Sequence, residues 1–234
     1  MKNNPISNSI KAVIFDMDGV LTETSKQHFH AWRRLANELG CDLPESVMDD
    51  VRGISRLASL DIVLNVCDLL SRYDDSEKVA LADLKNRYYL ESIDAFSEAD
   101  LSAGALKLLN ALKRKGLRIG LASASKNATQ LLKAMAIEPY FDAIVDPTTI
   151  NEGKPAPDIF LKAAELLDVK PEYCIGIEDA FAGIESIKAA GMTAYGIGNK
   201  AVLTNCDHVY HNLNALFGDW FEALHHADEN PLIR

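Results

Sequence analysis

Short apolar runs that alternate with helical segments constrain the fold of this chain more than any other feature. From Ser102 onward, segments with helical periodicity separate the apolar runs. These runs lie at 117–122, 143–145, 173–177 and 193–197. Successive parallel strands need a crossover connection, which is usually a helix. The pattern therefore predicts an α/β fold in which helices cover a parallel sheet, with the apolar run 11–15 as a further strand.

The segment 24–96 interrupts this alternation, because its patterns are those of helices alone. Its apolar side chains recur at three- and four-residue steps, the spacing that buries one stripe of a helix. We therefore predict that residues 1–23 and 97–234 form an α/β core and that residues 24–96 form a helical cap inserted after the first strand. Two connections, near Thr24 and at 95–100, would allow the cap to close over the core about a hinge.

Two carboxylates stand where the first predicted strand ends, in the stretch Phe15-Asp16-Met17-Asp18-Gly19-Val20. Side chains two residues apart in an extended segment point the same way, so Asp16 and Asp18 can face one site. Ligands of open α/β sheets bind beyond the carboxyl ends of the strands. One carboxylate could then hold Mg²⁺ while the other transfers protons. The alternative is an ordinary turn, since aspartate and glycine are common in turns.

Polar groups also follow three later strands. Ser123 to Asn127 stand at a predicted helix start, where hydroxyls and free N–H groups suit phosphate, although a simple helix cap is the alternative. Lys154 precedes a helix, where a cation is unfavourable for the helix dipole; the alternative is an exposed lysine without a role. Glu178 and Asp179 follow a buried strand and could bind Mg²⁺ or cap the next helix.

The four features together are difficult to explain as unrelated caps and turns, because each stands at the same predicted sheet edge. As a set they match the needs of phosphoryl transfer. They provide a carboxylate nucleophile, an acid/base, a hydroxyl and a cation for the phosphate oxygens, and a metal site that offsets the repulsion between two anions. The residues therefore indicate an enzyme that moves phosphoryl groups.

The motifs resemble those of the haloacid dehalogenase superfamily, and within it the β-phosphoglucomutase family, over about residues 11–198. The resemblance implies a Rossmann-like core with an α-helical cap. It implies that Asp16 is the nucleophile that forms an aspartyl-phosphate and that Asp18 is the general acid/base. Ser123 and Lys154 would also be catalytic, because they would hold the transferring phosphate. The implied Mg²⁺ site consists of Asp16, Asp18 through its backbone carbonyl, Glu178 and Asp179.

The predicted cap carries the features that favour a mutase over the phosphatases of the superfamily. Gly53-Ile54-Ser55-Arg56 resembles the mutase cap motif, whose arginine grips the phosphate that is not transferred. An exposed residue at a helix start is the alternative for Arg56. The same resemblance implies further substrate contacts in the cap and the core. The full set is Asp16, Asp18, Thr24, His28, Trp32, Gly53, Ile54, Ser55, Arg56, Lys85, Ser123, Ala124, Ser125, Lys126 and Asn127.

The implied reaction interconverts β-D-glucose 1-phosphate and β-D-glucose 6-phosphate through β-D-glucose 1,6-bisphosphate, with Mg²⁺ as the cofactor. A sugar-phosphate phosphatase on the same scaffold is the first alternative, and a non-catalytic phosphate-binding protein is a more remote one. We expect the partner to be a small sugar phosphate and the protein to be a cytoplasmic monomer without a nucleic-acid or membrane partner.

Composition supports these exclusions. The net charge of −10 argues against general nucleic-acid binding, which depends on a basic surface. No apolar run approaches the length of a membrane span, and the polar stretch Met1 to Ser9 is expected to be a mobile extension. The cysteines are scattered without a C-x-x-C pair, so we expect thiols in a reducing compartment, with neither a zinc site nor a disulfide. They are Cys41, Cys67, Cys174 and Cys206.

Overall fold

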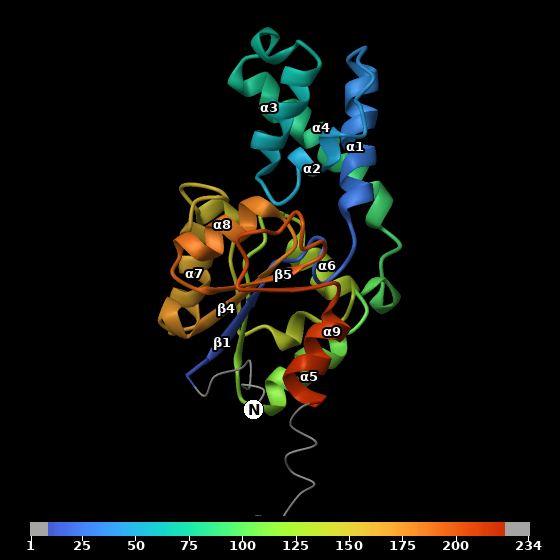
Figure 1. Cartoon of the computed structure of the whole chain (residues 1–234). Helices are drawn as coiled ribbons and strands as arrows, with labels where there is room; N and C mark the ends of the chain where they lie inside the picture. The colour runs from blue at the N-terminus through green and yellow to red at the C-terminus, as the bar shows by residue number, and fades with distance from the viewer. Residues whose placement is uncertain (1–8, 223–234) are drawn as a thin grey trace, which may run out of the picture.

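A parallel sheet forms the centre of the molecule (Figure 1). The computed structural model describes residues 9–222, and in them six strands pair in the order β3-β2-β1-β4-β5-β6. The strands are β1 Ala12–Phe15, β2 Arg118–Leu121, β3 Ala143–Ile144, β4 Cys174–Glu178, β5 Thr193–Ile197 and β6 His208–Tyr210. The predicted α/β fold is confirmed. The predicted N-terminal extension lies, apart from Ser9, outside the described residues.

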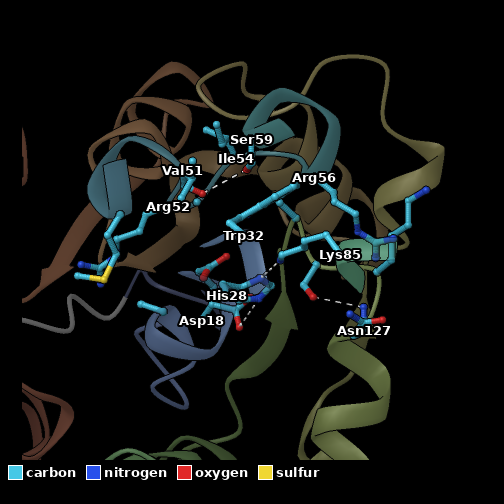
Figure 2. A pocket seen from close by; sticks show the side chains of 17 residues that line it. Asp18, His28, Trp32, Val51, Arg52, Ile54, Arg56, Ser59, Lys85 and Asn127 are labelled. Carbon is cyan, nitrogen blue, oxygen red and sulfur yellow. Dashed lines mark hydrogen bonds and ion pairs between the residues drawn. The ribbon is translucent and has the colours of Figure 1, made fainter. Parts of the chain in front are cut away.

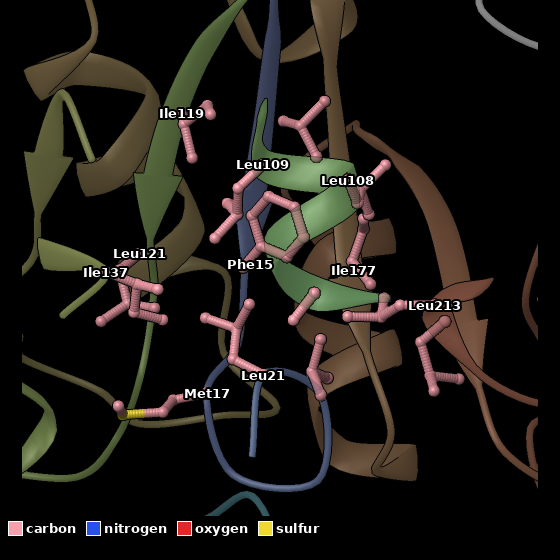
Figure 3. Packing of buried hydrophobic residues seen from close by; sticks show 14 of the residues in the cluster. Phe15, Met17, Leu21, Leu108, Leu109, Ile119, Leu121, Ile137, Ile177 and Leu213 are labelled. Carbon is pink, nitrogen blue, oxygen red and sulfur yellow. The ribbon is translucent and has the colours of Figure 1, made fainter. Parts of the chain in front are cut away.

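Helices cover both faces of this sheet. Alternate residues of β1 point to opposite sides, and each set is buried under helices. Val13 and Phe15 belong to one apolar cluster, which also contains buried leucines of α5, α6 and α9 (Figure 3). Ala12 and Ile14 belong to a second cluster, with α7 and α8. The helices are α5 Ala105–Arg114, α6 Ala128–Ala134, α7 Asp158–Leu166, α8 Phe181–Ala189 and α9 Leu213–Phe217. The core is thus a three-layer sandwich with β1 at its centre.

The remaining helices lie together beyond the carboxyl ends of the strands, above them in Figure 1. They are α1 Ser25–Glu38, α2 Val47–Asp50, α3 Arg56–Val66 and α4 Asp75–Ile93. An apolar cluster of their own, which includes Trp32, Leu35, Leu60 and Leu64, holds them together. Short helical turns occur at Leu70–Arg72, Glu98–Asp100, Glu138–Tyr140, Pro147–Thr149, Pro171–Tyr173 and Gly218–Glu222.

The prediction that the chain has no disulfide is wrong, because Cys41 and Cys67 are joined. Cys41 follows α1 and Cys67 ends α3, and these two helices pack on the same apolar cluster. Their packing brings the two Cα atoms to 5.7 Å, across 26 positions of sequence. Cys174 and Cys206 are free thiols, as predicted.

In the described residues beyond 198, where the motifs end and no helix or strand was predicted, lie β6, α9 and the helical turn Gly218–Glu222. β6 extends the sheet next to β5, and α9 packs against α5. Within residues 9–222, no helix is both long and apolar enough to cross a membrane.

Candidate active site

The carboxyl ends of β1 and β4 bring predicted site residues from distant parts of the sequence together. The Asp16 backbone N–H donates to the carbonyl of Ile177, which continues the pairing of β1 with β4 up to the site. The Lys154 ammonium, on the loop before α7, donates to Asp16 Oδ1 at 2.6 Å and to Glu178 Oε2 at 2.8 Å. All three side chains are buried. The structure thus joins three of the four predicted motifs in one contact.

The charges in this contact depend strongly on one another. Burial and the neighbouring Glu178 raise the pKa of Asp16 to about 8, against the lowering effect of Lys154. Burial would lower the pKa of Lys154, but Asp16 and Glu178 outweigh it, and the net shift is upward. Lys154 therefore stays charged, whereas Asp16 needs more positive charge nearby to be ionised at neutral pH.

A third carboxylate adjoins this pair. Asp16, Glu178 and Asp179 each offer an oxygen within 4.8 Å of the others. A set of carboxylate oxygens is the donor set that Mg²⁺ prefers. Gly19 belongs to the same site: its φ is +85°, and a Cβ there would lie 1.8 Å from Asp179 Oδ2. Only glycine allows the turn after β1 to come this close, and the crowded acids fit a divalent cation.

The Asp18 side chain lies next to His28 of α1 (Figure 2). The Thr24 hydroxyl donates to Asp18, and His28 Nε2 lies 3.7 Å from Asp18 Oδ1. Burial alone would raise the pKa of Asp18, but its interactions with His28 and Thr24 outweigh burial and lower it. An ionised Asp18 is ready to accept a proton from a hydroxyl group.

Lys85 continues this network into α4. Its Nζ lies 2.8 Å from His28 Nδ1, within hydrogen-bond distance, and 4.5 Å from the centre of the Trp32 ring. The side chain is buried, and burial, together with repulsion from Arg56, lowers the pKa of Lys85 to about 7. Lys85 is therefore a buried amine that can take up a proton when an anion arrives.

A cavity of about 70 Å³ lies between Asp18 and the helices above it (Figure 2), and Asp16 also lines this cavity. Most of the predicted substrate contacts line it. They are Asp16, Asp18, His28, Trp32, Gly53, Ile54, Arg56, Lys85, Ala124, Ser125, Lys126 and Asn127. Three predicted contacts do not line this cavity. The Thr24 hydroxyl donates a hydrogen bond to Asp18, and Ser55 lines a neighbouring cavity of about 270 Å³. Ser123 is buried, and its hydroxyl accepts a hydrogen bond from the Ser125 N–H at 3.1 Å.

Arg56 stands at the first position of α3, after Ser55, whose hydroxyl accepts from the Ala58 N–H and caps the helix. Its side chain is only 17 % exposed and lines the cavity. Arg56 Nη1 lies 3.4 Å from Asp83 Oδ1. This placement favours a role in the site over the alternative of an exposed residue at a helix start.

Sequence reasoning missed several residues of the site. The most important is Arg52, whose guanidinium forms an ion pair with Asp179. Asn86 accepts a hydrogen bond from Asn127 Nδ2 at 2.8 Å, and Met48 and Val51 line the cavity. The position of Arg52 directly before Gly53 of the cap motif was a signal that could have identified it.

Comparisons with known proteins agree with the resemblance that the motifs carry. Residues 10–191 match the family described as haloacid dehalogenase-like hydrolase. A β-phosphoglucomutase of Bacillus subtilis is 43% identical over 225 residues, which cover 96% of this chain and 98% of that protein. A phosphorylated carbohydrates phosphatase of Thermotoga maritima is 32% identical, over 80% of this chain and 85% of that protein. A crystal structure of β-phosphoglucomutase from Clostridium difficile superposes with a TM-score of 0.88 at 40% identity, covering 93% of this chain and 96% of that one.

Proposed function

The chain belongs to the haloacid dehalogenase-like hydrolase family, and from that premise we propose that it is a β-phosphoglucomutase. In this proposal it interconverts β-D-glucose 1-phosphate and β-D-glucose 6-phosphate through β-D-glucose 1,6-bisphosphate. One observation carries the proposal: the cavity has the carboxylates of Asp16 and Asp18 at one end and the cations Arg56 and Lys126 among the residues that close it. Such a site can bind both phosphates of a bisphosphate at once.

Asp16 would be the nucleophile of each half-reaction. Its carboxylate oxygen attacks phosphorus, the bond from phosphorus to the sugar oxygen breaks, and an aspartyl-phosphate forms. Asp18 donates a proton to the leaving sugar oxygen and accepts one from the hydroxyl that attacks in the reverse direction. Lys154 and Ser123 would hold oxygens of the transferring phosphate.

The acid cluster would hold Mg²⁺ through Asp16, Glu178 and Asp179, together with the backbone carbonyl of Asp18. When bound, the ion supplies positive charge that favours the ionised nucleophile and offsets the charge of the phosphate. The elevated pKa of Asp16, about 8, supports this assignment, because the described residues alone leave that carboxylate short of positive charge.

Arg56 would anchor the phosphate that is not being transferred, together with Ser125, Lys126 and Asn127, which line the same cavity. A guanidinium binds phosphate oxygens in a bidentate manner, which fixes both distance and orientation. Because the same anchor accepts either phosphate, the bisphosphate can turn round and return its other phosphate to Asp16. His28, Trp32 and Lys85 would then contact the sugar between the two ends.

Residues 24–96 would act as a cap that opens to admit the substrate. The cavity of about 70 Å³ is much smaller than the roughly 300–1,000 Å³ of typical small-molecule sites, so a sugar phosphate requires the helices α1–α4 to move away from the sheet. Closure then excludes water from the aspartyl-phosphate, which is what distinguishes a mutase from a phosphatase. A phosphatase on the same scaffold is the second candidate, favoured by the similarity to a carbohydrate phosphatase.

The test is a coupled assay with the purified full chain, Mg²⁺, β-glucose 1-phosphate and a trace of the bisphosphate, in which glucose 6-phosphate and free phosphate are measured together. We expect glucose 6-phosphate in large excess over phosphate, and no product after chelation of the metal. Phosphate release at the rate of isomerisation would identify a phosphatase instead. Ligand binding without turnover would identify a phosphate-binding protein.

We also propose a cytoplasmic monomer that binds neither nucleic acid nor membranes. The net charge of −10 supports the first exclusion, because nucleic-acid binding requires a basic surface. The Cys41–Cys67 disulfide argues against the cytoplasm, since disulfides persist best where conditions are oxidising.

A further inference from the structure

An arginine from the helical region reaches the acid cluster of the sheet. Arg52 stands between α2 and the turn at Gly53, and its guanidinium forms an ion pair with the carboxylate of Asp179. The Asp179 side chain is only 4 % exposed and that of Arg52 is 30 % exposed. A second carboxylate, Asp49, lies 3.7 Å from Arg52 but is largely exposed to water. The pair with Asp179 is therefore the stronger interaction.

The same carboxylate belongs to the candidate metal site. An oxygen of Asp179 lies within 4.8 Å of oxygens from Asp16 and Glu178. A divalent cation there would use the negative charge that Arg52 now neutralises, and the two cations would repel each other at this short separation. The ion pair and the metal therefore place opposing demands on one side chain.

The backbone beside Arg52 packs closely on the residue that follows the acid cluster. Gly53 has a φ of +71°, and a Cβ at this position would lie 2.9 Å from the Cβ of Ala180. The turn thus packs directly against the residue that follows Asp179. The ion pair of Arg52 with Asp179 is thus a further contact that holds this turn against the acid cluster, and the turn leads into α3.

We propose that Arg52 and a divalent cation compete for Asp179, so that metal binding releases the turn at Gly53 from the sheet. By linkage, the ion pair weakens metal binding to the same extent as the metal weakens the ion pair. This inference rests on the proposed metal site, but it does not depend on which phosphate ester is the substrate. It makes Arg52 a residue that holds the substrate-free cap closed until the metal is present.

The test measures Mn²⁺ binding to the substrate-free full chain, from the electron paramagnetic resonance signal of free Mn²⁺. We expect R52Q to bind Mn²⁺ about tenfold more tightly than the wild type, within the usual range of coupling between two sites. R52K keeps the charge and should stay closer to the wild type than R52Q does. R33Q is the matched control, because Arg33 is a cap arginine in an exposed pair with Asp42 and its loss changes the net charge equally.

A gain of less than threefold in R52Q, or an equal gain in R33Q, would overturn the competition. A D179N variant separates this failure from failure of the metal site. If D179N loses Mn²⁺ binding while R52Q gains nothing, the metal site stands and the competition does not. If neither the wild type nor R52Q binds Mn²⁺, both proposals fail.

Small-angle X-ray scattering of the wild type provides a second readout that needs no substitution. Addition of Mn²⁺ without substrate should increase the radius of gyration, because the cap is released from the sheet. R52Q should already have the larger radius before Mn²⁺ is added. A wild-type radius that does not change at saturating Mn²⁺ would contradict the release of the cap.

Discussion

At the scale of single residues, the site consists of buried charges that compensate one another. The Lys154 ammonium has no exposure to solvent and is shared by two carboxylates, Asp16 and Glu178. Loss of one member of such a group leaves an uncompensated charge in a poorly solvated place. The nucleophile is therefore best tested with a substitution that retains its shape.

Asp16→Asn should abolish turnover, with a loss on the order of 10⁴-fold or more, because an amide cannot form the acyl phosphate. The measurements are the rate of glucose 6-phosphate formation and the incorporation of labelled phosphate into the protein. Asp42→Asn, at an exposed carboxylate of the cap, should retain both. Near-normal turnover in Asp16→Asn would show that another residue is the nucleophile.

Lys85 should make the stability of the fold depend on pH. Its pKa is lowered to about 7 by burial and by Arg56, whereas a lysine in the unfolded chain has a pKa of 10.5. Between these values the unfolded chain binds a proton that the native state lacks, so the free energy of unfolding rises with pH. The rise is at most about 1.4 kcal/mol per pH unit.

The measurement for Lys85 is urea denaturation of the wild type and of Lys85→Met at pH 7 and pH 9. From pH 7 to pH 9 the wild type should gain about 2 kcal/mol relative to the variant, because methionine has no proton to lose. Equal changes in the two proteins would mean that Lys85 has an ordinary pKa in the native state.

At the scale of helices, the disulfide joins the C-terminal ends of α1 and α3, and the N-terminal parts of both helices line the cavity. α1 carries His28 and Trp32 and is followed by Cys41, while α3 begins with Arg56 and is followed by Cys67. The cross-link thus limits how far the two helices can separate. The shared apolar cluster holds them together in any case, so the disulfide adds stability to an arrangement that packing already favours.

Cys41→Ser should lower the free energy of unfolding by about 3 kcal/mol, because a closed loop of this length removes conformational freedom from the unfolded chain. Urea denaturation without reductant measures the difference. Dithiothreitol should lower the stability of the wild type to that of the variant. Cys206→Ser, at a free thiol, is the control: it should keep the stability of the wild type without reductant and lose as much as the wild type when dithiothreitol is added. A wild type that is insensitive to reductant would show that the bond does not form in solution.

At the scale of the whole molecule, the proposed active site lies where the helices α1–α4 meet the carboxyl ends of the strands. Neither part alone encloses the cavity, which is lined by Asp16 and Asp18 of the core and by Arg56 and Trp32 of the helices α3 and α1. Binding energy from the far phosphate can therefore be used to close the two parts around the reacting one.

Arg56→Ala should separate this closing role from the chemistry itself. Mutase turnover should fall on the order of 10²-fold, because the far phosphate loses its anchor and the hydroxyl is no longer aligned. Phosphorylation of Asp16 by a small donor such as acetyl phosphate should change much less, since that donor has no second phosphate. Equal losses in the two assays would count against the anchor. Arg34→Ala, at an exposed cap arginine paired with Glu91, is the control.

Local patterns in the chain were enough to predict five of the six strands that the structure describes, and the motifs at the edge of the sheet. The apolar runs that became β1 and β4 are short and continuous, and burial on both faces of a sheet requires such runs. The positions of Asp16 and Glu178 follow from the same local rule, because each stands where its strand ends. Periodicity also predicted the helices of the cap, since one apolar stripe per helix is a property of neighbouring residues.

Contacts between distant residues could not be derived in this way. The ion pair of Arg52 with Asp179 spans 127 positions, and the Cys41–Cys67 disulfide spans 26. Residues that are far apart in the sequence give no local signal that they will meet in the fold. The pattern around Arg52 therefore does not point to Asp179, and the pattern around Cys41 does not point to Cys67. The direction of Asp18 towards Thr24 and His28 is of the same kind. These features arise from the packing of one part of the chain on another, which fixes side chains that local propensity leaves free.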